Sequence, residues 1–321
     1  MPLGFIAMNE ALVSVVVPLF NKEKYISTTL KSVVAQTYEH IEVIVIDDSS
    51  TDEGLQIAKG VLASHRNRFL NVRVITRSNT GQAAARNEGI GCASGEYVAF
   101  LDADDVWHPD KISKQVKYLE ENSSKDIVFC NYFMFFENSS KVKAIRLFPI
   151  DKKIKSWLLT TGYGGLLEST GLARKHSLLR LGGFDQNLQM CGGLDLAFRF
   201  SDLKTAGSVD DYLCGYRVTA GGWHNNKSDL MKSYDLLMEK SDLYGDSESR
   251  ARKFLNIHLL VWQIRNGQRG ESLWQLFLFV MKNPLLFCRY VLATAGRVFL
   301  ASFRSYLLRE GSTQMRKLLS L

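Results

Sequence analysis

The stretch from Tyr97 to Asp105 is an apolar run that passes directly into three carboxylates, Asp102, Asp104 and Asp105. Its apolar part, Tyr97–Leu101, has the length and character of a strand buried in a parallel sheet. Ligands of such sheets bind just beyond the carboxyl ends of the strands. Three neighbouring carboxylates repel one another unless they share a cation, and oxygen ligands of this kind suit Mg²⁺ or Mn²⁺ bridging to a phosphate. The alternative interpretation is a solvated acidic turn that caps the next helix.

The first 136 residues alternate strand and helix patterns, and this alternation sets the expected fold. Strands are expected at Val13–Val17, Ile41–Ile46, Val72–Thr76, Tyr97–Leu101 and Ile127–Phe136. Helical patterns lie between them, over Lys22–Gln36, after residues 50–52, over Gly81–Ala93 and from Pro109 to about Asn122. The sequence therefore predicts a Rossmann-like α/β fold, with a right-handed and mostly parallel sheet flanked by helices.

A second acidic cluster, Asp47-Asp48, follows the second expected strand. In a parallel sheet both clusters face the same edge, so one can hold a metal-bound diphosphate while the other binds a nucleobase or ribose. Arg86 and Asn87, near the start of the intervening helix, favour such a nucleotide site. The alternative is a pair of ordinary strand-to-helix loops. The chain has neither G-x-G-x-x-G nor G-x-x-x-x-G-K, which argues against a Rossmann dinucleotide site and a P-loop.

Composition narrows the protein class. Hydrophobic residues make up 46% of the 321 residues, as in an ordinary globular protein. Five cysteines are scattered without metal-binding spacing, and no secretory signal is recognisable, so reduced thiols in a cytoplasmic protein are expected.

The charge is unevenly distributed along the chain. Residues 250–321 contain 12 Lys and Arg against 2 Asp and Glu, a net charge of +10. The whole chain has a net charge of +7, so residues 1–249 have a net charge of −3. Charged residues interrupt the apolar stretch Leu273–Phe303, so no uncharged run approaches the ~20 residues of a membrane span.

Four stretches, in order and spacing, resemble a family 2 glycosyltransferase. They are VSVVVPLFNKEKYISTTLKSVVAQTY (13–38), IEVIVIDDSSTD (41–52), SNTGQAAARNEGIGCASGEYVAFLDADDVWHPDKI (78–112) and GLARKHSLLRLGGFD (171–185). The resemblance implies a nucleotide-sugar-binding fold of the GT-A type. It implies a catalytic domain over residues 10–225, with a nucleotide-binding half (10–136) and an acceptor half (137–225). Residues 226–321 are expected to form a basic, aromatic-rich helical extension.

The same resemblance assigns roles to individual residues of the donor site. Pro18 and Asn21 are expected to lie against the nucleotide base. Asp48 matches the carboxylate that accepts a hydrogen bond from the uracil ring nitrogen, and Arg86 belongs to the segment that lines the diphosphate. Asp102 and Asp104 match an Asp-x-Asp motif, in which the first carboxylate lies near the ribose and metal and the second ligates Mg²⁺ or Mn²⁺.

The chain departs from the family pattern at the general base. Inverting members carry Glu-Asp-x-Asp/Glu-Leu-x-x-Arg, whereas residues 192–199 read GGLDLAFR. This alignment places Gly193 at the base position, and glycine cannot accept the proton of the attacking hydroxyl. The expected catalytic base is therefore Asp195, brought into place by a locally shifted loop.

Other interpretations of these residues remain open from the sequence. The base carboxylate can instead come from Asp185 or Glu168, and Asp195 can form an i,i+4 ion pair on its helix. His224 lies where family members often place a histidine near the diphosphate, but it also fits a surface loop. Asp105 is expected to cap the helix after Pro109 rather than to bind metal.

The basic tail has three interpretations: helices packed on the catalytic domain, a nucleic-acid surface, or attachment to a membrane. Membrane attachment is favoured over nucleic acid, because many such transferases modify lipid-linked acceptors. The expected protein is peripheral on the inner face of the cell membrane.

The expected function is metal-dependent, inverting transfer of a hexose or N-acetylhexosamine from a UDP-sugar to a saccharide acceptor. Polyprenyl-diphosphate-linked glycans of bacterial surface polysaccharide biosynthesis are the acceptors considered. Two alternatives remain: a non-catalytic sugar-nucleotide-binding or scaffold protein that has lost its base, and, with less support, a nucleotidyltransferase that makes the sugar nucleotide.

Overall fold

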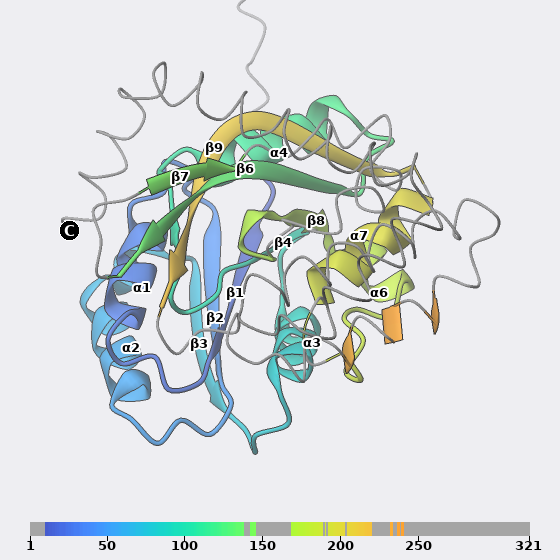
Figure 1. Cartoon of the computed structure of the whole chain (residues 1–321). Helices are drawn as coiled ribbons and strands as arrows, with labels where there is room; N and C mark the ends of the chain where they lie inside the picture. Colours follow the sequence, from blue (N-terminus) through green and yellow to red (C-terminus); the bar gives the residue numbers. More distant parts are fainter. Residues whose placement is uncertain are drawn as a thin grey trace, which may run out of the picture.

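A computed structural model describes residues 10–137, 142–145, 168–188, 190, 192–202, 204–219, 232–233, 236–237 and 239–240 (Figure 1). Its strands are β1 (Val13–Leu19), β2 (Ile41–Asp47), β3 (Asn71–Thr76), β4 (Tyr97–Phe100), β5 (Val106–Trp107), β6 (Ile127–Phe136), β7 (Val142–Ile145), β8 (Leu172–Arg174) and β9 (Ala206–Val218). Its α-helices are α1 (Ile26–Val34), α2 (Gly54–Ser64), α3 (Gln82–Cys92), α4 (Lys111–Glu121), α6 (Lys175–Arg180) and α7 (Gly192–Asp202). Two 3₁₀ turns, η1 (Arg66–Arg68) and η2 (Glu168–Thr170), complete the described elements.

The strands of the described residues form one mixed sheet in the order β3-β2-β1-β4-β8-β6-β9-β5, with β7 paired to β6. The first four strands in this order, β3, β2, β1 and β4, are parallel to one another. β8 then runs antiparallel to both β4 and β6, and β5 runs antiparallel to β9. The expected parallel sheet is therefore present in the β3-β2-β1-β4 half, and the sheet becomes mixed from β8 onward.

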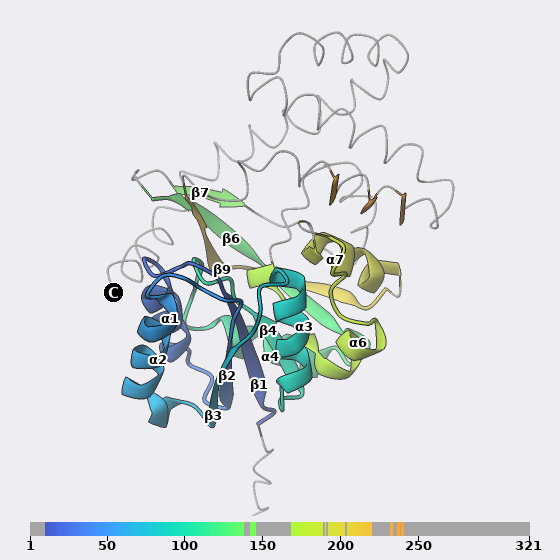
Figure 2. The same cartoon turned by 90° about the horizontal axis from the view of Figure 1, so that it is seen from below.

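Helices cover both faces of the parallel half. Figure 2 shows α1 and α2 on one side of β1–β3 and α3 on the other. Every residue of β1 and β2 is buried, which explains their continuous runs of valine and isoleucine instead of a polar–apolar alternation. α3 packs against both strands, and its buried residues include Ala83, Ala84 and Ala85.

The expected elements of the first 136 residues are confirmed, with shifts of a few residues at their ends. β6 spans the expected ten residues, and β2 extends one residue further, to Asp47. Asp52 accepts a hydrogen bond from the first backbone N–H of α2, so it is the member of the 50–52 group that supports this helix start. Among the described residues, no helix is long and apolar enough to cross a membrane.

Candidate active site

The two acidic clusters lie at the same edge of the sheet. β1 pairs in parallel with β2 so that Leu19 faces Asp47, and the backbone N–H of Asp48 continues this pairing by donating to the carbonyl of Leu19. On the other side of β1, the N–H of Leu101 donates to the carbonyl of Val16, immediately before the second cluster. The carboxyl ends of β2 and β4 therefore flank the end of β1, as the sequence predicts.

Asp48 lies buried at this edge and organises the loop before α3. Its two carboxylate oxygens accept the backbone N–H groups of Thr80 at 3.1 Å and Gly81 at 2.9 Å. Arg77 lies 3.6 Å from the same carboxylate. Gly81 has a φ of +96°, which glycine adopts without strain. A carboxylate fixed in this way offers its remaining lone pairs to a ligand in a defined direction.

Asn21 joins the loop after β1 to the loop after β2. Its backbone N–H donates to Ser50 Oγ at 3.1 Å, and its Oδ1 accepts the N–H of Thr51 at 2.8 Å. Pro18 is buried within β1, three residues earlier, while Phe20 between them is 44% exposed. The segment expected to lie against a nucleotide base therefore presents an exposed aromatic ring beside a fixed loop.

Arg86, on α3, is the central cation of the site. Its Nη2 lies 2.5 Å from Asp102 Oδ1, its Nη1 lies 3.5 Å from Glu168 Oε1, and its guanidinium lies 5.4 Å from the ring centroid of Phe184. Burial alone would lower the pKa of this guanidinium, but the carboxylates of Asp102 and Glu168 raise it above its usual value. Arg86 is therefore a fixed positive charge between two carboxylates that come from different elements.

Asp104 is held by two cations from distant parts of the chain. Lys22, just after β1, places its Nζ 2.5 Å from Asp104 Oδ2. Arg217, near the end of β9, donates from Nε to the backbone carbonyl of Asp104 at 2.9 Å, and its guanidinium lies 5.0 Å from the ring of Tyr25. Neither cation is predicted from the sequence. Lys22 could have been recognised from its position directly after Asn21, within the stretch 13–38 that resembles the family.

The donor set of Asp102 and Asp104 fits a divalent ion. Each carboxylate has one oxygen engaged by a cation, and neither Asp102 Oδ2 nor Asp104 Oδ1 has a hydrogen-bond partner in the described part of the chain. The described residues contain no cluster of three or more metal-ligating side chains. Mg²⁺ is commonly bound through one or two carboxylates together with substrate phosphates, and two carboxylates meet that requirement.

Asp105 does not cap α4, contrary to the expectation. It is fully buried, accepts the hydroxyl of Ser169 at 2.6 Å and accepts the backbone N–H of Arg217 at 3.1 Å. The residue at the N-cap of α4 is Asp110. Burial, together with repulsion from Asp104 and Asp102, raises the pKa of Asp105 well above its usual range. Asp105 thus connects the loop after β4 to η2 and β9.

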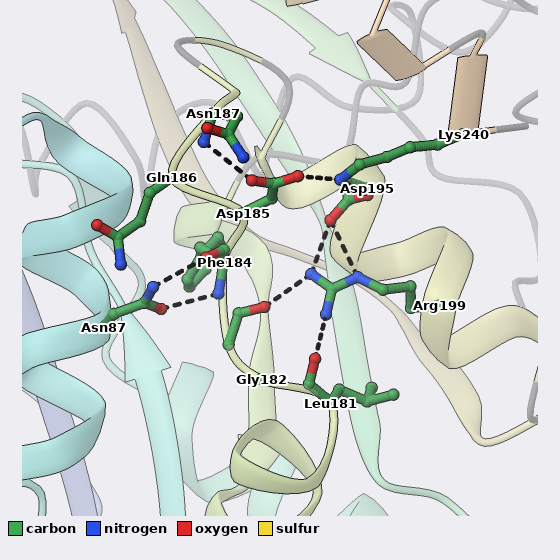
Figure 3. Close-up of a pocket in the computed structure, with 11 residues that line it drawn as sticks. Asn87, Leu181, Gly182, Phe184, Asp185, Gln186, Asn187, Asp195, Arg199 and Lys240 are labelled. Atoms are coloured by element: carbon green, nitrogen blue, oxygen red, sulfur yellow. Dashed lines mark hydrogen bonds and ion pairs between the residues drawn. The ribbon is translucent and has the colours of Figure 1, made fainter.

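A polar pocket of about 470 Å³ has Asn87, the residue after Arg86, in its lining (Figure 3). It is bounded by α3, by the turn after α6, by α7 and by Lys240. Asn87 fixes the turn, because its side-chain amide donates to the carbonyl of Phe184 and accepts its N–H, both at 2.8 Å. Gly183 has a φ of +69° and leaves no room for a side chain, since a Cβ there would lie 2.4 Å from Asn87 Oδ1.

Asp195 and Asp185 meet in this pocket at the ammonium of Lys240. Asp195 Oδ2 accepts two hydrogen bonds from Arg199, at 2.7 and 3.0 Å, and its Oδ1 accepts one from Lys240 at 3.3 Å. Asp185 pairs with Lys240 and also accepts the backbone N–H of Asn187. Burial raises the pKa of Asp185, but the hydrogen bonds from Lys240 and Asn187 and the charge of Lys240 together lower it below its usual value. The i,i+4 pairing considered for Asp195 is therefore present.

The described residues bring together Pro18, Asn21, Asp48, Arg86, Asp102 and Asp104 along one edge of the sheet. His224 and almost all of the expected extension from residue 226 lie outside the described residues, so the roles predicted for them stay predictions. Cys92, Cys130 and Cys214 are free thiols, as expected.

Comparison with known proteins matches the family model "Glycosyl transferase family 2" over residues 14–180. The chain is 31% identical over 202 residues to the amylovoran biosynthesis glycosyltransferase AmsB of Erwinia amylovora, covering 61% of this chain and 66% of that protein. It spans only 18% of the length of an uncharacterized glycosyltransferase of Rickettsia conorii, with 38% identity over 116 residues.

Two solved structures share the fold. The crystal structure of S. aureus TarS 1–349 in complex with UDP-GlcNAc has a TM-score of 0.59 and 23% identity, covering 79% of this chain and 73% of that chain. The mannosyltransferase PcManGT from Pyrobaculum calidifontis, in complex with GDP-Man and Mn²⁺, has a TM-score of 0.55 and 19% identity, covering 97% and 86%. Both confirm the GT-A-type fold. Because the family match covers more than half of the chain, this protein belongs to glycosyl transferase family 2.

Proposed function

We propose that this protein is a metal-dependent, inverting glycosyltransferase that moves a hexose or N-acetylhexosamine from a UDP-sugar to a saccharide hydroxyl. The observation that carries the proposal is the convergence of Asp48, Arg86, Asp102 and Asp104 at one edge of the sheet. The UDP-GlcNAc complex of TarS, a protein of the same fold, supports a nucleotide-sugar donor.

Different residues of the described part bind different parts of the donor. Asp48 and the Pro18–Asn21 segment receive the base, while Arg86 sets the position of Asp102 through a partly buried ion pair. Bound at Asp102 and Asp104, Mg²⁺ or Mn²⁺ would neutralise the charge that develops on the departing nucleoside diphosphate. Lys22 supplies a further positive charge beside Asp104 and, with its side chain 24% exposed, is free to turn toward a phosphate.

The acceptor proposal draws on one of the relatives. AmsB carries amylovoran biosynthesis in its name, which supports an acceptor in polysaccharide biosynthesis for this chain. We propose a saccharide acceptor, with polyprenyl-diphosphate-linked glycans as the class to test first.

Replacing Asp104 by alanine is expected to reduce nucleotide release at least about 100-fold, because the diphosphate loses a metal ligand. The measurement is UDP released from a panel of UDP-sugars with Mn²⁺ and candidate acceptors. Asp110→Ala is the matched control, since Asp110 is an exposed carboxylate at the start of α4. Unchanged release in Asp104→Ala would overturn the metal assignment, and no release by the wild type with any donor would overturn the proposed donor class.

We also propose a cytoplasmic protein held peripherally on the inner face of the cell membrane by residues 250–321. Their net charge of +10, with interleaved Trp, Phe and Tyr, suits an anionic lipid surface. Deleting the chain after Arg250 is expected to move the protein from the membrane fraction to the soluble fraction. Purified full-length protein should bind vesicles containing anionic lipid and release them at high salt. An unchanged membrane fraction after the deletion would refute this attachment.

A further inference from the structure

The carboxylate of Glu168 occupies the space beside Gly193. Glu168 is the first residue of η2, and its Oε1 accepts the backbone N–H of Gly193 at 2.8 Å, in the first turn of α7. A Cβ added to Gly193 would lie 2.9 Å from Cδ and 3.2 Å from Cγ of Glu168. A side chain at position 193 would therefore have to displace the Glu168 carboxylate, which lies beside the position where α7 has no carboxylate of its own.

We propose that Glu168 is the general base of this chain, taking the proton from the acceptor hydroxyl in place of a carboxylate at position 193. This inference rests on the proposed glycosyltransferase function and adds the identity of one catalytic residue.

The position of Glu168 relative to the donor site supports this assignment. Arg86 lies between Glu168 Oε1, at 3.5 Å, and Asp102 Oδ1, at 2.5 Å. A single guanidinium therefore links the carboxylate of η2 to the residue proposed to bind metal. The Glu168 side chain is 15% exposed, and its Oε2 has no hydrogen-bond partner among the residues that the structure describes. One oxygen is fixed by the protein, and the other remains available to a substrate hydroxyl.

Asp195 and Asp185, the other two candidate bases, are less suitable because their carboxylates are already paired with cations. Asp195 lies two positions after Gly193 on α7, about 200° around the helix from it. Both Asp195 oxygens are engaged, one by Arg199 and the other by Lys240. Asp185 shares that same ammonium across the pocket of Figure 3. Neither aspartate has an ion pair with Arg86 in the described part of the chain.

The proposed reaction forms one bond at the anomeric carbon and breaks another. The acceptor oxygen forms a bond to the anomeric carbon while the bond from that carbon to the diphosphate oxygen breaks. The electron pair of the broken bond leaves with the nucleoside diphosphate. The proton of the acceptor hydroxyl passes to Glu168 Oε2, and no further reactant is needed.

Glu168→Gln separates this role from a purely structural one. Glutamine has the same shape and can still accept the Gly193 N–H, but it cannot take up the proton. We expect kcat to fall about 10²- to 10⁴-fold, with the donor KM within about threefold and the fold retained, because Asp102 still pairs with Arg86. Glu96→Gln is the matched control, since Glu96 also forms an ion pair with an arginine, Arg174, but is 55% exposed.

A second pair of variants moves the carboxylate back to α7. Glu168→Ala removes both the proposed base and the obstruction beside position 193. Adding Gly193→Asp to Glu168→Ala should restore kcat at least about tenfold over Glu168→Ala alone. Gly193→Asp in the wild-type background should instead be destabilised, because its Cβ meets Glu168. The restored rate distinguishes a lost base from a lost helix contact.

Three results would overturn the inference. If Glu168→Gln has the same kcat as the wild type, Glu168 is not the base, and the proposed function still stands. A loss of kcat in Asp195→Asn with no loss in Glu168→Gln transfers the role to Asp195. No nucleotide release by the wild type with any donor and acceptor overturns the proposed function and this assignment together.

Discussion

Replacing Arg86 by methionine should lower the free energy of unfolding by about 3–5 kcal/mol, the usual cost of removing one partner from a buried ion pair. The Arg86 side chain is 4% exposed and faces the carboxylates of Asp102 and Glu168. Methionine fills much of the same volume beside Phe184, so the cost arises from two carboxylates that lose their cation. The same change should abolish nucleotide release, because both carboxylates are then free to move.

Urea unfolding of the full-length protein measures the first effect and the UDP-release assay measures the second. Arg86→Lys keeps the charge but cannot bridge two carboxylates with a planar group, so it should recover only part of the stability. Arg180→Met is the control, since Arg180 also pairs with an aspartate, Asp126, but is 58% exposed, and a loss of at most about 1 kcal/mol is expected. A loss of similar size in Arg86→Met would mean that this ion pair contributes little to the fold.

The parallel half of the fold could be predicted because its signals are local. The runs over residues 13–19 and 41–47 are mostly apolar, with Ser14, Glu42 and Asp47 as exceptions, since helices cover both faces of the sheet. Each run is followed directly by residues of the site. The parallel arrangement then places Asp48 and Asp102 at one edge without any knowledge of side-chain contacts.

The antiparallel half could not be predicted in the same way. β8 has only three residues, yet it lies between β4 and β6 and makes the sheet mixed. Three residues carry no periodicity from which a strand could be recognised.

Contacts between segments that are distant in the sequence could not be predicted either. Lys22 and Asp104 are 82 positions apart, and Arg217 reaches the carbonyl of Asp104 across 113 positions. The sequence showed Asp105 as one more acid before a helix, whereas its burial depends on Ser169 and Arg217 arriving from later elements. Such roles follow from tertiary packing, which no local pattern contains.

Lys111 should make the stability of the protein rise with pH between about pH 8 and pH 10.5. It is fully buried at the start of α4, with its Nζ 2.7 Å from Gln115 Oε1 and 4.1 Å from the ring centroid of Trp107. Burial lowers its pKa from 10.5 to about 8. The unfolded chain therefore holds a proton between these two values that the folded protein has released, and stability increases with pH wherever the unfolded state binds more protons.

A comparison with Lys111→Met isolates this effect. The penalty is fully present below about pH 8 and disappears above pH 10.5, so wild type should gain about 3 kcal/mol relative to Lys111→Met from pH 7 to pH 10.5. Groups distant from Lys111 titrate in both proteins and cancel in the difference, whereas the buried thiol of Cys130, with its pKa raised to about 11 mainly by burial, interacts with the charge of Lys111. Lys117→Met, on the exposed face of the same helix, should show no comparable change. A difference between wild type and Lys111→Met that is constant with pH would mean that Lys111 stays protonated in the folded protein, with Gln115 and Trp107 compensating for its burial.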